Sequence, residues 1–184
     1  MNEVLKTIAN RYSCRSYKDV MPDDATLRAI AQAGVSAPSG MNRRPWQVII
    51  VKDTALIREI DDAGMAMLKA QPDQSMYERM MGRSGNMLYG APCMMVVVSK
   101  PDDRAEMDCG IVAQNITLAA TSLGLGSVIC GLMRIPLDGE KGADFKKRLS
   151  FSDGYEFGIA VLLGYEDKKG EPSEPALDKI LTVE

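Results

Sequence analysis

Residues 34–46 read GVSAPSGMNRRPW, and this stretch separates a helix-like apolar segment from a strand-like run. Pro38 disfavours a helical residue before it, so the preceding helix is expected to end near Ala37. Gly40 lets a ligand approach the main chain closely, and Asn42 offers side-chain donors. Taken alone, the stretch also suits an ordinary helix-to-strand connection, because proline, glycine, serine and asparagine are common turn residues.

The overall composition is that of a single globular domain. The chain has 184 residues, of which 46% are hydrophobic and 26% charged. A net charge of -3 argues against nucleic acid or an anionic membrane as the main partner. No apolar run approaches the length of a membrane span, and the polar start MNEVLKTIANRYS does not resemble a secretory signal.

The four cysteines and the missing histidines limit the possible chemistry. Cys14, Cys93, Cys109 and Cys130 show no Cys-x-x-Cys spacing, so neither a zinc knuckle nor a dithiol redox motif is expected. A reduced, cytoplasmic setting is the simpler interpretation. Without histidine there is no Ser-His-Asp or Cys-His arrangement. We therefore expect no metal site and no catalytic side chain; in an enzyme, a cofactor would carry the chemistry.

Hydrophobic periodicity and turn residues predict an irregular mixture of helices and strands. No G-x-G-x-x-G follows a strand, so a dinucleotide-binding fold is not indicated. We expect an α+β fold, with a central sheet and helices on both of its sides. Strands are predicted at 46–52, 92–99, 127–132 and 155–164, and helices around 4–8, from 23 or 24 to near 37, from 53 or 54, within 64–90 as broken helix, at 108–123, and around 145–149.

Arg11, Ser13 and Arg15 form the first candidate binding motif. In an extended segment alternate side chains share a face, so all three would point the same way. Guanidinium forks and a hydroxyl suit a phosphate. The alternative is a pair of surface arginines that form ion pairs with Asp19 or Asp23.

A glycine-rich stretch, LGLGS at 123–127, forms the second candidate. Glycines after a helix usually form its C-cap. Gly131, in the strand that follows, can mark a close approach to a ligand. Neither signal is specific by itself.

In their order along the chain, these features resemble the FMN-dependent nitroreductase family. The resemblance covers nearly the whole chain, and the ordered set is far more specific than any one motif. The residues that carry it are Arg11-x-Ser13-x-Arg15, APSGMNRRPW at 37–46, Ala91-Pro92, Gln114-Asn115, Gly124-Leu125-Gly126-Ser127 and Gly164-Tyr165.

The resemblance implies a homodimer with a mostly antiparallel mixed sheet and two FMN sites at the subunit interface. Arg11 and Ser13, with Tyr12 between them, would hold the phosphate, and Arg15 would lie near the pyrimidine side of the flavin. The partner subunit would contribute its own 38–44 loop. The full set of expected cofactor contacts is Arg11, Tyr12, Ser13, Arg15, Pro38, Ser39, Gly40, Asn42, Arg44, the backbone around Ile129, Cys130 and Gly131, and Lys168.

The chain departs from the family pattern in three places. Many members have glutamine where this chain has Arg44, and a C-terminal arginine that commonly contacts the phosphate is missing from 166–184. Lys168 or Lys169 would replace it. The segment 64–90 is short and rich in methionine, and its methionines would either line an adaptable acceptor site or fill the core or dimer interface.

The function implied by the resemblance is transfer of electrons from NADH or NADPH to a flat, electron-poor acceptor such as a nitroaromatic or a quinone, by a ping-pong mechanism. The alternatives are a flavoprotein of the same fold with a different oxidative role, a flavin-storage or binding protein, and a relative that has lost FMN. Residues 1–165 would form the FMN-binding domain, and 166–184 a C-terminal arm able to wrap the partner subunit.

Overall fold

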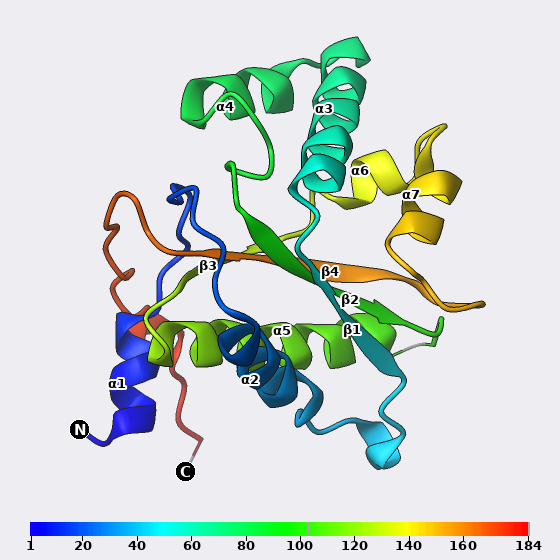
Figure 1. Ribbon diagram of the computed structural model, residues 1–184. Coiled ribbons are helices and arrows are strands. Elements are labelled where there is room, and N and C mark those ends of the chain that lie inside the picture. Colours follow the sequence, from blue (N-terminus) through cyan, green and yellow to red (C-terminus); the bar gives the residue numbers. More distant parts are fainter. Residues whose placement is uncertain (103, 184) are drawn as a thin grey trace.

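The computed structural model describes residues 1–102 and 104–183, and it is a sheet covered by helices on both faces (Figure 1). The four strands are β1 (Trp46–Val51), β2 (Cys93–Ser99), β3 (Gly126–Cys130) and β4 (Glu156–Gly164). The helices are α1 (Glu3–Asn10), α2 (Asp24–Val35), α3 (Thr54–Ala70), α4 (Ser75–Arg83), α5 (Ala105–Ser122), α6 (Arg134–Leu137) and α7 (Gly142–Arg148), with short 3-10 turns η1 (Gly40–Asn42) and η2 (Leu177–Lys179).

The sheet has the strand order β1-β2-β4-β3, and all of its neighbouring strands are antiparallel. Parallel pairing occurs at an isolated bridge between Ser13 and Ser127, which adds the N-terminal segment to the edge strand β3. In β4, Gly158 lies between the partners of Val97 and Val98, and forms a bulge. The predicted α+β class with a mostly antiparallel sheet is confirmed.

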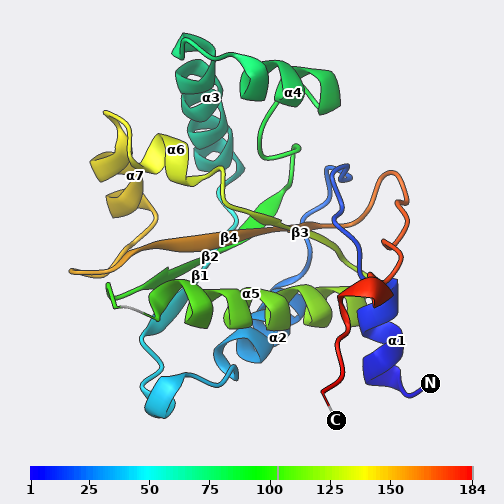
Figure 2. The same ribbon diagram turned by 180° about the vertical axis from the view of Figure 1, so that it is seen from behind.

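Both faces of β2 are buried, so its residues alternate between two hydrophobic cores. Met94, Val96 and Val98 belong to the core beneath α3, α6 and α7. The odd-numbered residues of the strand, such as Met95 and Val97, belong to the core with α2 and α5. Figure 2 shows these two helical layers on opposite sides of the sheet.

The predicted starts of α2 and α3 are confirmed, and their caps explain them. The Asp23 carboxylate accepts a hydrogen bond from the Thr26 amide at 2.8 Å, and that of Asp53 accepts one from the Leu56 amide at 3.0 Å. Helix α2 ends at Val35, two residues before Ala37.

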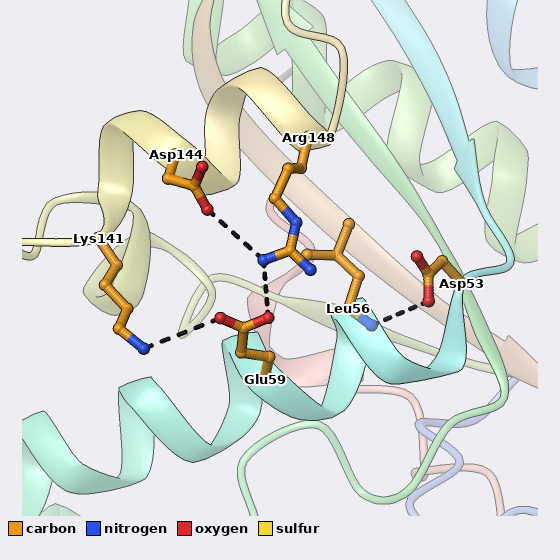
Figure 3. A network of polar contacts seen from close by, with 6 residues as sticks. All are labelled: Asp53, Leu56, Glu59, Lys141, Asp144 and Arg148. Atoms are coloured by element: carbon orange, nitrogen blue, oxygen red, sulfur yellow. Dashed lines mark hydrogen bonds and ion pairs between the residues drawn. The ribbon is translucent and has the colours of Figure 1, made fainter.

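An exposed ionic network joins α3 to α7 (Figure 3). Arg148 Nη1 lies 2.7 Å from Glu59 Oε2 and 3.5 Å from Asp144 Oδ2. Lys141 Nζ lies 3.8 Å from the other oxygen of Glu59. The helix predicted around residues 145–149 is therefore linked to α3 by ion pairs, and Phe145 and Leu149 belong to the same hydrophobic core as buried residues of α3.

Two boundaries differ from the prediction. Helix α5 begins at Ala105, three residues before the expected 108. Strand β3 ends at Cys130, because the chain turns at once, with the Arg134 amide donating to the Gly131 carbonyl at 3.1 Å. Helix α6 follows from that turn and was not predicted.

The C-terminal arm is attached at its start and exposed beyond it. Tyr17 and Glu166 form an antiparallel bridge, and the Asp167 amide donates to the Ser16 carbonyl at 3.0 Å. Apart from η2, no helix or strand forms between residues 167 and 183. In the described part of the chain, no helix is both long enough and apolar enough to cross a bilayer.

Candidate functional site

A cleft of about 550 Å³ opens between the segments 12–17, 83–90 and 168–170. In Figure 1 the first two segments lie between α4 and the sheet, and the third belongs to the neighbouring loop after β4. Four cationic side chains line the cleft, and none of the described residues that line it is acidic. We call it the basic cleft; its cations are Arg15, Arg83, Lys168 and Lys169.

The pairing of the N-terminal segment with β3 positions Ser13 and Arg15. The Cys14 amide donates to the Ser127 carbonyl at 2.9 Å, and the Cys14 side chain is buried against Gly126. Because side chains alternate in extended backbone, Ser13 and Arg15 then both line the cleft on the other side. The structure brings these two predicted residues together with Tyr12 and Lys168.

Arg11 lines a different, neighbouring hollow. It is the C-cap residue of α1, and its amide donates to the Thr7 carbonyl at 3.0 Å. The hollow measures about 750 Å³ and lies between α1 and residues 171–175 of the arm. The structure thus separates Arg11 from Ser13 and Arg15, and its expected contact with a phosphate stays a prediction.

Two tyrosines stiffen the wall of the basic cleft. The Tyr12 ring packs so closely on Gly170 that a Cβ there would lie 2.5 Å from Cε2. Burial, and then the nearby Glu166 carboxylate, raise the pKa of Tyr12 to about 12. The Tyr17 hydroxyl donates to the Cys14 carbonyl at 2.9 Å, and burial raises its pKa. Both phenols are therefore protonated at neutral pH; the Tyr17 hydroxyl donates a hydrogen bond, whereas the buried Tyr12 hydroxyl has no hydrogen-bond partner among the described residues.

A buried carboxylate holds the wall of the basic cleft that residues 83–90 form. Asp61 of α3 accepts hydrogen bonds from the amides of Met87 and Leu88, at 2.9 and 3.3 Å. Burial raises the pKa of Asp61, and these amide bonds oppose the shift. The sequence analysis did not identify this residue. The available signal was that Asp61 lies at helical spacing from Ile57, on the face of α3 that is expected to be buried.

Tyr89 presents its ring to Arg15. The Arg15 guanidinium lies 5.9 Å from the ring centroid, a cation–π distance. Tyr89 has φ 55°, a left-handed conformation that is unusual for an aromatic residue. Tyr89, Asn86 and Arg83 all line the cleft and were not predicted as site residues.

The predicted strand residues lie at a third hollow, of about 340 Å³, beside β3. Ile129 and Gly131 line this strand-edge hollow, and Ile129 is 43% exposed. Cys130 points the other way, into the core beneath α6, so only its backbone is available there. Within residues 1–102 and 104–183, β3 pairs with β4 alone among the strands, and its outer edge lies open beyond the Ser127 bridge.

The 38–44 loop is strained and internally hydrogen bonded. Met41, Asn42 and Arg44 have φ values of 52°, 55° and 49°, in the left-handed region that favours glycine. Ser39 Oγ accepts from the Arg44 amide at 2.8 Å, and Arg44 Nε donates to Asn42 Oδ1 at 2.9 Å. Such strain persists only where the surroundings or a function require it.

The loop precedes β1 and lies on the opposite side of the molecule from two segments that line the basic cleft, residues 12–17 and 168–170, as both ribbon views show (Figures 1 and 2). Within one chain, therefore, five of the predicted cofactor contacts lie far from the predicted residues that line the basic cleft. These residues are Pro38, Ser39, Gly40, Asn42 and Arg44.

The cysteines do not form a reactive centre. All four are buried free thiols. Burial raises the pKa of Cys93 to about 12 and that of Cys109 to about 11, and it also raises the pKa values of Cys14 and Cys130. The described residues contain no group of three or more histidine, cysteine, aspartate or glutamate side chains able to hold a metal ion.

Solved structures of other proteins share this architecture. The chain is 49% identical to a nitroreductase from Desulfitobacterium hafniense DCB-2 solved with bound FMN, with complete coverage of both chains (100%) and a TM-score of 0.97. An FMN-bound nitroreductase from Bacteroides fragilis NCTC 9343 is 29% identical, also with 100% coverage of both chains, and has a TM-score of 0.90.

A curated relative, the FMN reductase [NAD(P)H] of Bacillus subtilis, is 30% identical over 139 residues. The match covers 73% of this chain and 56% of that protein, so this chain spans little more than half of the relative's length. The model of the Nitroreductase family matches residues 8–165. On this match and this fold, the chain belongs to the nitroreductase family.

Proposed function

We propose that the protein is an FMN-dependent oxidoreductase that passes electrons from NADH or NADPH to a flat, electron-poor acceptor such as a nitroaromatic or a quinone. The observation that carries the proposal is the basic cleft. A protein with a net charge of -3 gathers four cations there. The FMN bound by the Desulfitobacterium and Bacteroides nitroreductases, and the activity named for the Bacillus reductase, support the same conclusion.

The donors at the cleft fit the phosphate of FMN. A phosphate dianion needs charged and hydroxyl donors, and Ser13 and Lys168 supply both kinds. Arg11 reaches the same region from the adjoining hollow in this proposal. Lys168 replaces the C-terminal arginine that the family commonly uses.

The remaining contacts suit a flavin ring. Arg15, held against Tyr89, places a positive charge where negative charge would develop on the pyrimidine side. The open edge of β3 offers backbone donors around Ile129 and Gly131. When bound, FMN supplies the redox chemistry, by accepting a hydride from the nicotinamide and giving electrons to the acceptor. The chain binds the cofactor, orients it and leaves one face open.

A homodimer would complete the site. The 38–44 loop is strained, exposed and distant from the basic cleft of its own chain. A second copy could place Pro38, Ser39 and Asn42 beside that cleft. Exposed apolar side chains on α1 and the arm would be covered in the same assembly, with residues 166–184 wrapping the partner; these side chains are Val4, Leu5, Ile8, Leu177, Ile180 and Leu181.

The kinetics should be ping-pong, because donor and acceptor would occupy the same open face in turn. No side-chain acid or base is required, since water can supply protons. This is consistent with a chain without histidine, whose buried thiols and tyrosine hydroxyls near the site are protonated at neutral pH.

The test is an absorbance spectrum of the purified protein before and after anaerobic addition of NADH or NADPH. We expect a yellow protein whose visible bands bleach with the donor and return with a nitroaromatic. A flavin band that does not respond to either donor would favour a different oxidative role. A response to the donor without turnover of any acceptor would favour storage, and a colourless protein that does not bind added FMN would reject the proposal.

A further inference from the structure

Two cations of the basic cleft are left over once the proposed flavin contacts have been assigned. Lys168 is assigned to the phosphate, and Arg15 to the ring. Arg83, the last residue of α4, and Lys169, from the arm, line the same cleft but have no role in that assignment.

In the part of the chain that the structure describes, these cations also have no acidic partner. Among residues 1–102 and 104–183, neither Arg83 nor Lys169 forms an ion pair within 4.0 Å. Both side chains are exposed to solvent. In α7, by contrast, Lys146 and Arg148 pair with carboxylates. Unpaired cations that converge on one cleft favour an anionic ligand.

The cleft therefore holds more positive charge than FMN needs. The FMN phosphate has a charge of about -2, which Lys168 and Arg11 can match. NADPH differs from NADH by one further phosphate, on the adenosine ribose. We infer that Arg83 and Lys169 bind this extra phosphate, and that the enzyme selects NADPH over NADH. This inference rests on the proposed function.

The position of Arg83 suits this role. It lies on the wall formed by 83–90, whereas the residues assigned to the flavin phosphate come from the N-terminal segment and the arm. Asp61 fixes this wall by accepting hydrogen bonds from the amides of Met87 and Leu88. The side chain of Met80 is buried and anchors the end of α4 in the core. Arg83 is thus an exposed side chain on an anchored support, as a specificity contact requires.

The test compares Arg83→Gln with a matched control, Arg79→Gln, in the FMN-loaded protein. Arg79 is exposed, lies one turn earlier on α4 and does not line the cleft. We expect Arg83→Gln to lower the ratio of kcat/KM for NADPH to that for NADH roughly 3- to 10-fold, as for loss of one exposed charged contact. Arg79→Gln should leave the ratio unchanged, and Arg83→Lys should keep most of it.

A binding measurement separates this inference from turnover. Calorimetric titration with NADP⁺ and NAD⁺ should show the same loss of preference in Arg83→Gln, with FMN affinity unchanged. Added salt should weaken NADP⁺ binding more than NAD⁺ binding, because screening acts on the extra phosphate.

Three results would overturn the inference: a wild-type preference for NADH, an equal effect of Arg83→Gln on both dinucleotides, or a loss of FMN affinity in that variant. The last result would assign Arg83 to the flavin phosphate. If the wild type binds no FMN, or if neither dinucleotide reduces it, the proposed function itself fails, and the inference fails with it.

Discussion

Arg11 and Ser13 are two residues apart in sequence, yet they line different hollows. The cause is local. Arg11 still caps α1, whereas Ser13 is already paired with Ser127 of β3. Arg11 already has an extended backbone, with φ -66° and ψ 131°, but its amide is still bonded to the last turn of α1, so alternation alone does not decide where its side chain lies.

Arg11→Ala tests whether a side chain from the adjoining hollow still reaches the phosphate. We expect FMN binding to weaken by about 1.5–3 kcal/mol, the effect of losing a charge-assisted hydrogen bond. Quenching of FMN fluorescence measures the affinity, and Arg79→Ala, outside both hollows, is the control. An unchanged affinity would remove Arg11 from the site.

Asp61 gives a prediction about pH. Its folded pKa is raised, so the folded state holds the proton more tightly than the unfolded state, whose pKa is about 3.9. Its contribution to stability is then fully present below about pH 4 and is lost as the pH rises through the folded pKa. Asp61→Asn keeps an oxygen acceptor and cannot ionise, so its free energy of unfolding should rise relative to wild type between pH 4 and 7.

Urea unfolding at several pH values measures this difference. Asp61→Ala is the second variant: it leaves the buried amides of Met87 and Leu88 without an acceptor and, because it cannot ionise either, should be less stable than Asp61→Asn by about 1–3 kcal/mol at all pH values. A difference between wild type and Asp61→Asn that does not change with pH would contradict the raised pKa.

The site residues that could be predicted from sequence are those whose direction is set by their own segment. Ser13 and Arg15 follow from alternation in an extended strand. Arg83 and Tyr89 reach the basic cleft only because α4 and the 84–90 wall fold over the N-terminal segment. That contact joins residues about 70 positions apart in sequence and depends on tertiary packing, which neither periodicity nor composition contains.

At the level of elements, the bulge in β4 and helix α5 are fitted to each other. A Cβ on Gly158 would lie 2.5 Å from Cys109 Sγ and 3.0 Å from the Val97 carbonyl oxygen. Gly158→Ala should therefore destabilise the protein by about 1–3 kcal/mol through overpacking. Adding Cys109→Ala should recover part of that loss, because the thiol is removed while the carbonyl contact stays.

Thermal or urea unfolding of the two single variants and the double variant gives the interaction energy. Effects that simply add would show that Cys109 is not the group that Gly158 avoids. Gly110, one residue along α5, has no neighbour within 4 Å of a Cβ, so Gly110→Ala is the matched control.

Capping and periodicity predicted most elements, because both are local properties. The starts of α2 and α3 follow from the aspartates before them, and β2 from an unbroken apolar run. Helix α6 has four residues and contains Pro136, so it is too short to show a periodicity. Its turn takes the two residues after Cys130 that were expected to extend β3.

For the whole molecule, the strained 38–44 loop and the basic cleft must be explained together. They lie on opposite sides of the folded chain. The loop has a strained backbone and the cleft gathers cations, and both features are typical of binding sites. A symmetric dimer, as proposed above, would explain both, because the same interface would then form two equal sites, each with one half from either chain. Exposed apolar side chains on α1, α5 and the arm, such as Ile8, Met107 and Leu181, would supply part of the interface.

Mixed dimers distinguish a shared site from two separate ones. One variant carries Arg15→Gln in the cleft, and the other carries Asn42→Ala in the loop; each homodimer should bind FMN poorly. If each site is shared between subunits, a mixed dimer has one site with both changes and one intact site. Random mixing of equal amounts makes half of the dimers mixed, so binding should recover to about a quarter of the wild-type sites. If each site lies within one chain, every site keeps a defect and mixing restores nothing, a result that FMN titration of the refolded mixture would show directly.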